Sequence, residues 1–350
     1  MLDTFKAFPG WLKCLVICPL LFLNSWLLLL LFDYLQPLIT ILITAAIFAF
    51  LLDLPTQFLQ TRGVARGWAI AIVLIIALLV LGGVGVTIGP VVLEQLNALV
   101  KNLPQLIKSG DRQLQLLQQF SLSHNLPINL PVLLDQAVKQ LGTVFQLASS
   151  QVLNVITTTI NSVVNILFFL VLAIFIVIGG KSAWNGIFSW FPSPWNETLK
   201  DSVQTTFRRY FGTQALLAVI LSVAQTVGLV LWGVPYAILF GITIGVTTLV
   251  PYASAVTILV VSIIVALQDF GLGVKVLITA ITIGQINDIF LSPRLMGETI
   301  GLNPIWLVAA LFLGGKVGGV LGLLVAVPVA SVIKSLADQL RSSEARSSEA

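Results

Sequence analysis

Long apolar runs, about eight of them, dominate this chain of 350 residues, and each approaches or exceeds the roughly 20 residues that a membrane-spanning helix needs. Their approximate bounds are 11–32, 36–53, 68–90, 156–179, 211–232, 236–267, 272–292 and 304–333. Hydrophobic residues make up 57% of the chain and charged residues 9%, against roughly 25% charged in a soluble domain. The sequence therefore predicts an all-α polytopic membrane protein whose helices face membrane lipid.

Basic residues in the short loops predict the orientation. An alternating path through the runs places four basic groups on one side, which the positive-inside rule makes cytoplasmic. They are Lys6 and Lys13; Arg62 and Arg66; Lys181, Lys200, Arg208 and Arg209; and Lys334, Arg341 and Arg346. We therefore expect both termini in the cytoplasm, and we assign the net charge of +4 to topology and not to nucleic-acid binding.

The chain divides into five expected regions. Residues 91–155 form an outer region in which leucines recur at helical spacing, with a break around 123–131, so we expect amphipathic helices packed on the membrane surface or on a neighbouring subunit. The repeated RSSEA ends the chain and predicts a disordered tail. The regions are the first spans, 1–90; the outer region, 91–155; the fourth span and its loop, 156–210; a C-terminal core, 211–336; and the tail, 337–350.

Residue types that carry enzyme chemistry are scarce. His124 is the single histidine and lies in a polar loop, so a catalytic set built on histidine is not expected. Cys14 and Cys18 share a helix face but have no histidine or carboxylate neighbours, whereas a metal site takes about four ligands. The sequence predicts a protein that is not an enzyme and that needs no cofactor or metal.

Charged residues inside the apolar segment 285–336 are the best indication of function. Asn287, Asp288, Arg294 and Lys316 all lie there. Such residues are costly at membrane depth and usually line a path or a binding site. Alternatives are an ion pair between Asp288 and Arg294 and, at Gly314, Gly315, Gly318 and Gly319, close packing of small residues between helices.

Two apolar runs are too long for one ordinary span and contain helix breakers. Run 236–267 contains VPYASA with Pro251, and run 304–333 contains GGKVGG. In one topology each run is a tilted helix; in the other each is a re-entrant hairpin, and the two hairpins form an inverted repeat. Inverted repeats with broken helices place solute sites near the bilayer midplane.

Amide side chains also form a stripe on the fourth run. Asn154, Thr158, Asn161 and Asn165 follow one another at i, i+4, i+7 and i+11, which places them on one face of a helix. Such side chains need partners in lipid. They either form hydrogen bonds to another helix or line the path of a solute.

The C-terminal motifs resemble those of the autoinducer-2 exporter family of bacterial multi-pass membrane proteins, the PerM-like permeases. They read PRLMG…GLNPIWLVAALFLGGKVGGVLGLLVAVPVASVIKSL, preceded by GVPYAILFGI…LVPYASAVTI. The resemblance extends from about residue 37 to 336. It implies a transporter in the bacterial inner membrane, with autoinducer-2 export proposed for some members and cation/proton antiport for others.

Two departures from the family pattern affect the candidate residues. The family usually has glycine soon after the proline of the first break, whereas Pro251 is followed by Tyr252, Ala253 and Ser254. It usually has an acid and then asparagine before the Pro-Arg step, whereas this chain has Asn287 and then Asp288.

From these patterns we predict a secondary transporter for a small polar organic solute. Its expected path or coupling residues are Lys316, Asp288, Asn287, Arg294, Asn161, Asn165, Pro251, Gly314, Gly315, Gly318 and Gly319. The expected partners are the solute, membrane lipid and further copies in a homo-oligomer. Two rival functions are a cation/proton antiporter and a membrane scaffold that binds partners through the outer region.

Overall fold

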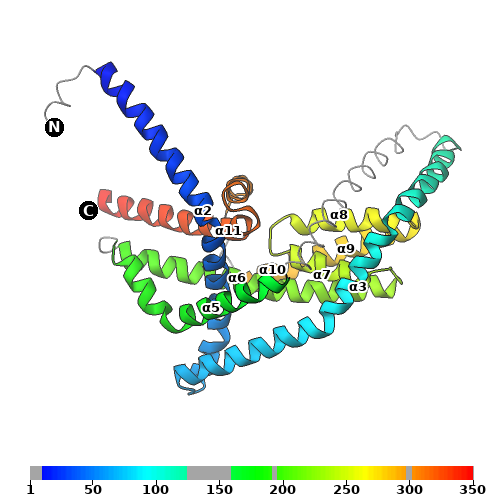
Figure 1. The fold of residues 1–350 in the computed structure, drawn as a ribbon, viewed down its shortest axis with the longest axis horizontal. Coiled ribbons are helices and arrows are strands. Elements are labelled where there is room, and N and C mark those ends of the chain that lie inside the picture. Colours follow the sequence, from blue (N-terminus) through cyan, green and yellow to red (C-terminus); the bar gives the residue numbers. More distant parts are fainter. Residues whose placement is uncertain (1–9, 124–158, 191–194, 297–301, 350) are drawn as a thin grey trace.

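The computed structural model describes residues 10–123, 159–190, 195–296 and 302–349, and within these ranges the regular structure is helical throughout (Figure 1). This agrees with the predicted all-α class. The elements are α2 (Gly10–Thr61), α3 (Arg66–Ser123), α5 (Thr159–Phe188), α6 (Trp195–Leu231), α7 (Ala237–Thr247), α8 (Ala253–Ala266), α9 (Phe270–Ile286), the π-helix η1 (Asn287–Leu291), α10 (Ser292–Met296) and α11 (Pro304–Glu349).

Helix α2 joins the first two predicted runs into one element of 52 residues with Pro19, Pro37 and Pro55 inside it. The predicted reversal between residues 32 and 36 is absent, so the alternation behind the predicted N-terminal orientation loses one crossing. The polar Asp33 and Gln36 are too few to end the helix, because an apolar backbone in lipid keeps its hydrogen bonds by remaining helical.

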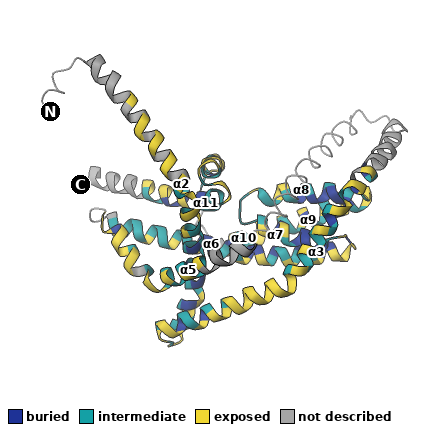
Figure 2. Cartoon of the chain, viewed as in Figure 1, coloured by how far each residue is buried: buried dark blue, intermediate teal, exposed yellow. Residues whose placement is uncertain are grey.

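Helix α3 extends for 58 residues and carries the third run directly into the outer region. Its first half is mostly exposed, whereas Leu99 and Leu106 in its second half are buried against α7, α8 and α9 (Figure 2). The first amphipathic stretch of the outer region is therefore helical, as predicted, and it packs on this same chain. The second stretch, at 134–145, lies outside the described residues.

Helices α7 and α8 form a pair that folds back at residues 248–252. The Asn102 amide of α3 donates to the hydroxyl of Tyr236, just before α7, and Gly110 of α3 lies against Leu267, just after α8. The start of α7 and the end of α8 therefore lie at one end of the pair. We call residues 248–252, at the other end, the first reversal.

Helix α11 also folds back, at Gly319, whose φ of 56° and ψ of −135° are not helical. A Cβ on Gly314 would lie 2.5 Å from the carbonyl oxygen of Gly322. In a straight helix these residues would be about 12 Å apart along the axis. Gly319 therefore turns one arm of α11 back against the other, and we call it the second reversal. Figure 1 shows the orange part of α11 end-on and the red part running sideways.

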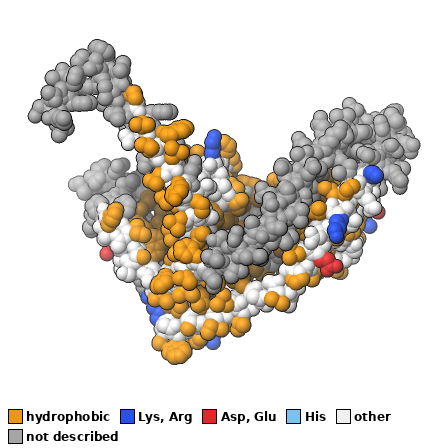
Figure 3. Space-filling model, viewed as in Figure 1, with side chains coloured by type: hydrophobic (Ala, Val, Ile, Leu, Met, Phe, Trp, Pro, Cys, Tyr) orange, Lys and Arg blue, Asp and Glu red, His pale blue; other side chains and the backbone are white. Residues whose placement is uncertain are grey.

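Five helices of the described chain are long and apolar enough to cross a membrane, or six if a bent pair in α5 counts as one span. The five are Tyr34–Thr61, Arg66–Leu106, Asn196–Leu231, Phe270–Leu295 and Pro304–Asp338. The predicted count of about eight is not reached, because the first two runs join and α7 and α8 have only 11 and 14 residues. Hydrophobic side chains cover much of the outer surface, as lipid contact requires (Figure 3).

The C-terminal tail differs from the disordered segment predicted for residues 337–350. Helix α11 continues to Glu349 and includes most of the RSSEA repeat. Alanine, arginine and glutamate are strong helix formers, so two polar repeats appended to an existing helix extend it without further packing. The repeat therefore lengthens α11.

Two hydrophobic cores hold the described helices together. The first lies among the second half of α3, the end of α6, and α7, α8 and α9. The second joins α2, the middle of α6 and both arms of α11. Helix α6 belongs to both cores, with Leu229 in the first and Tyr210 and Phe211 in the second. The middle of α6 is therefore where the two halves of the structure meet.

Candidate functional site

The candidate site lies on the buried face of α6 at Tyr210 and Gln214. The Tyr210 hydroxyl donates to the carbonyl of Leu249 in the first reversal at 3.5 Å. Gln214 follows one turn later and hydrogen-bonds the Tyr210 hydroxyl. Both side chains are buried, with 3% and 6% of their surface exposed. Burying a phenol and an amide costs free energy unless their polar atoms are hydrogen-bonded, and the side-chain carbonyl oxygen of Gln214 has no partner in the described part of the chain.

Both reversals reach this part of α6. Val250 of the first reversal packs in the same hydrophobic cluster as Tyr210. Leu311 and Leu323, one from each arm around the second reversal, belong to that cluster too. The Thr213 hydroxyl donates to the carbonyl of Leu295 in α10 at 3.2 Å, so a third break in helical structure adjoins the same face. Irregular backbone at membrane depth is tolerated where protein or a water-filled cavity surrounds it.

The first reversal contains a tyrosine in a conformation that favours glycine. Among the described residues, Tyr236 and Tyr252 are the non-glycine residues with positive φ, at 61° and 66°. Each occupies the third position of a Val-Pro-Tyr-Ala sequence, at 234–237 and 250–253, and each begins a helix. The sequence prediction missed this repeat, which was visible as two copies of VPYA 16 residues apart. Strained backbone of this kind concentrates at functional sites.

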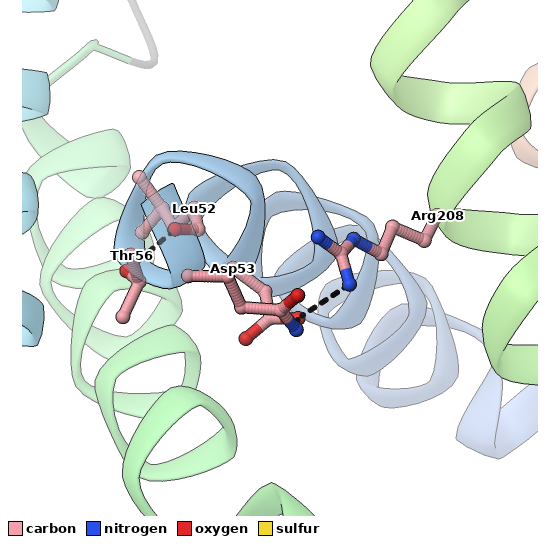
Figure 4. Close-up of polar contacts among 5 residues, drawn as sticks. Leu52, Asp53, Thr56 and Arg208 are labelled. Atoms are coloured by element: carbon pink, nitrogen blue, oxygen red, sulfur yellow. Dashed lines mark hydrogen bonds and ion pairs between the residues drawn. The ribbon is translucent and has the colours of Figure 1, made fainter. Parts of the chain in front are cut away.

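An ion pair joins α2 to α6 beside the site (Figure 4). Arg208 of α6 lies 3.9 Å from the carboxylate of Asp53 in α2, and the Gln57 amide donates to the same carboxylate oxygen at 2.7 Å. Both charged side chains are about one third exposed. The pair places the end of the second predicted run beside the start of the fifth.

The predicted residues Asn287, Asp288 and Arg294 lie around the π-helix η1. The Asn287 side chain is buried with 4% exposed, and its amide donates to the Asp288 carboxylate at 2.9 Å. Asp288 and Arg294 are exposed on the single chain. Asn287 therefore faces the protein interior. Because this chain has asparagine before the acid, and the family pattern has the acid first, an amide occupies the position where an acid was expected. π-helical turns occur frequently at functional sites.

The glycines around the second reversal bring the arms of α11 together, and Lys316 accompanies them. Gly314 lies against Gly322 and Ala326, and Gly315 lies against Leu323. Gly318 and Gly319 have open space beside them. Lys316 is exposed on the single chain.

The remaining predicted residues occupy the first reversal and α5. Pro251 is half-buried in the first reversal. Asn161 and Asn165 lie in α5, and their side chains, with residues 154 and 158, fall outside what the structure describes. The structure therefore brings Pro251 to the candidate site, while the asparagine stripe stays a prediction.

The chemistry available at the site is uncharged. Among the described residues, the buried polar side chains are Thr56, Gln214, Gln225, Ser262, Asn287 and Ser331, which are all neutral. In the same ranges no group of three or more histidines, cysteines or acids is arranged to hold a metal ion. The site can therefore offer hydrogen bonds and apolar contacts to a polar solute.

Comparison with known proteins identifies the family. A sequence model described as "AI-2E family transporter" matches residues 16–342, which is nearly the whole chain. The chain belongs to this family. The match confirms the resemblance noted from the sequence. The matched residues include both reversals and the candidate site on α6.

Similar curated proteins are named for transport. A Synechocystis protein named "Putative transport protein sll0060" is 32% identical over 332 residues, covering 94% of this chain and 96% of its own length. Its relative sll0063 is 34% identical over 344 residues, covering 97% and 87%. The Escherichia coli protein named "Putative permease PerM" is 24% identical over 311 residues, covering 84% and 85%. These names support assigning the AI-2E chain to membrane transport.

Proposed function

We propose that this chain is a secondary transporter that moves a small polar organic solute, of the autoinducer-2 kind, across the bacterial inner membrane. The observation that carries the proposal is the meeting of two chain reversals on one buried face of α6, at Tyr210 and Gln214. Discontinuous helices that meet inside a membrane bundle are how secondary transporters build solute sites. The driving force would be an ion gradient or the gradient of the solute itself.

In this proposal each reversal is the tip of a re-entrant hairpin. Helices α7 and α8 have 11 and 14 residues, about 17 and 21 Å, which is too short to cross a hydrocarbon core of about 30 Å. The first arm of α11, residues 304–318, is also short at about 22 Å, whereas the second arm continues from residue 320 to Glu349. The cytoplasmic side would carry Asp53 and Arg208, and the outer half of α3 would cover the α7–α8 pair from outside.

The predicted charged residues keep a role in coupling in this proposal. Lys316, Asp288 and Arg294 are exposed on the single chain, within or beside apolar segments. A charge facing lipid is costly, so a water-filled path or a further copy of the chain would cover them. A homo-oligomer would supply such a cover.

Two structural observations favour a transporter of an organic solute over the two rival functions, a membrane scaffold and a cation/proton antiporter. The outer half of α3 is occupied by its own chain, with Gln95 accepting from the backbone of Leu239 at 2.9 Å, which leaves less of it for a scaffold partner. A cation/proton antiporter usually keeps an acid deep in its bundle, whereas the described buried polar residues are neutral.

Uptake into proteoliposomes tests the proposal. Purified protein is reconstituted, and entry of candidate polar solutes is followed with and without a pH gradient. Wild-type protein should carry at least one solute faster than empty liposomes, and Asp288→Asn should alter its dependence on the gradient. If no candidate solute moves faster than in empty liposomes under either condition, the transporter proposal is overturned.

A further inference from the structure

Helices α6 and α9 meet along a regular buried seam. On α6 the buried positions recur every four residues at Leu217, Leu221, Gln225 and Leu229. On α9 Val276 and Ala280 are fully buried, and Asn287 continues the same spacing into η1. A seam of this spacing is normally apolar throughout. Amides therefore occupy positions where leucine or alanine would be expected.

Three seam amides have a buried carbonyl oxygen with no hydrogen-bond partner in the described part of the chain. They belong to Gln214, Gln225 and Asn287, of which 6%, 1% and 4% is exposed. The donor side is in use, because the Gln225 amide donates to the Ala280 carbonyl at 3.1 Å and the Asn287 amide donates to Asp288. An unsatisfied buried acceptor destabilises the fold, because it has lost its hydrogen bonds to water without replacement. Three in one seam need an explanation.

The positions of these oxygens suit a path better than a single site. Gln214 and Gln225 are three helical turns apart, about 16 Å along α6, and within about 20° of the same face. The helices are antiparallel, since Thr213 contacts Leu295 and Gln225 contacts Ala280, so Asn287 lies between the two glutamine levels. One small ion cannot bridge that span. Acceptors at successive depths suit a solute that moves past them.

We propose that the α6–α9 seam is the deeper part of the solute path, and that Gln214, Asn287 and Gln225 accept hydrogen bonds from a neutral solute rich in hydroxyl groups. This inference rests on the proposed transport function. The three unpartnered amide oxygens are hydrogen-bond acceptors, and the described buried side chains include no cation, so an anion is disfavoured. The π-helix η1 lies at the Asn287 level, where departures from regular helix allow local rearrangement.

A purely structural role for the amides makes a different prediction. Polar residues in an apolar seam can fix the register of two helices at a cost in stability. In that case the seam stays dry, and a thiol placed at an amide position is as protected as one at a leucine position. Solvent access to the seam therefore separates a path from a register device without any transport measurement.

Substituted-cysteine labelling in membranes measures this access. The background is the full chain with Cys14→Ser and Cys18→Ser, checked by size-exclusion chromatography. Gln225→Cys is compared with Leu229→Cys, and Gln214→Cys with Leu217→Cys, because each control lies about one turn away and is also buried. The reagents are methanethiosulfonate ethylammonium and the anionic ethylsulfonate of similar size.

We expect Gln225→Cys and Gln214→Cys to react at least about tenfold faster than their leucine-position controls, and faster with the cation than with the anion. An excess of ribitol, a neutral polyhydroxy probe, should slow the reaction, whereas an equal concentration of lactate should not. Equal rates at amide and leucine positions would overturn the path. Equal protection by lactate would overturn the neutral solute. Neither result decides the transport function, which the uptake test measures separately.

Discussion

The two reversals turn the chain back by different means. The first uses Pro251 and a tyrosine, Tyr252, at a φ of 66°, and its helices are braced by α3, α6 and α9. The second uses Gly319 at a φ of 56°, and its arms lie against α2 and the middle of α6. A bulky residue can hold a left-handed backbone where the surroundings over-determine it, whereas the less supported turn needs glycine.

The helices around the first reversal are more deeply buried than those around the second. Helices α7 and α8 contribute Phe240, Ile244, Val261 and Val265 to the first core, all below 5% exposed. Much of α11 is exposed, including Phe312, Leu313, Val317 and Val320 near the second reversal (Figure 2). Segments with few buried contacts open most easily. We therefore expect the second reversal to be the mobile one of the two.

The largest loss of stability should come from adding a side chain where Gly241 of α7 packs against α6. A Cβ on Gly241 would lie 2.5 Å from the backbone nitrogen of Thr226 in α6, and a backbone cannot move aside cheaply. Gly241→Val should lower the free energy of unfolding by about 3 kcal/mol, measured by thermal denaturation in detergent. The matched control is Gly284→Val in α9, where the nearest atom is 4.0 Å away. Equal losses in both variants would contradict the tight contact.

The second reversal should lose stability when Gly319, its one non-helical residue, is substituted. Gly319→Ala forces an L-residue into a backbone conformation that only glycine adopts readily, at a cost of about 2 kcal/mol. Gly318→Ala has the same open space around it without the positive φ, and should leave stability unchanged or raise it slightly. Thermal denaturation of the two variants isolates backbone strain. A neutral Gly319→Ala would show that the turn is not required.

The hydrogen bond that joins α3 to the α7–α8 pair can be measured as a coupling free energy between two residues. Asn102 donates to the Tyr236 hydroxyl at 2.7 Å, which ties α3 to the start of α7. Tyr236→Phe and Asn102→Ala should each cost about 1 kcal/mol, and the double variant should cost less than their sum. Strict additivity in this double-mutant cycle would mean that the bond does not hold α3 in place.

The smallest effect should come from the ion pair between α2 and α6. Asp53 and Arg208 are about one third exposed, so solvent screens their attraction. Asp53→Asn should cost no more than about 0.5 kcal/mol, and less at high salt. Gln57→Ala is the companion variant because Gln57 donates to the same carboxylate. A loss above about 2 kcal/mol that persists in high salt would mean that the pair acts as a buried one.

The sequence predicted the helical class and the presence of interruptions in the last apolar runs. It could not show that α2 continues past Asp33, because a few polar residues look the same whether the chain turns or continues. It also directed attention to charge. Lys316 and Asp288 are conspicuous in the sequence but exposed on the chain, whereas the buried Gln214 and Gln225 resemble ordinary polar residues until α6 is packed. Depth depends on tertiary packing and is not encoded locally.

The central claim, that two chain reversals meet on α6, is tested most directly by the distance between the two arms of α11. Spin labels on Ile305→Cys and Ile333→Cys, in the Cys14→Ser and Cys18→Ser background, occupy exposed positions on the two arms, and electron–electron double resonance measures their separation. The arms cross near Gly314 and Gly322, and each label lies about ten residues from that crossing. A fold at Gly319 therefore predicts a separation of roughly 20 Å plus the lengths of the labels. A separation of about 42 Å, the span of 28 residues in a straight helix, would contradict the second reversal and the site built on it.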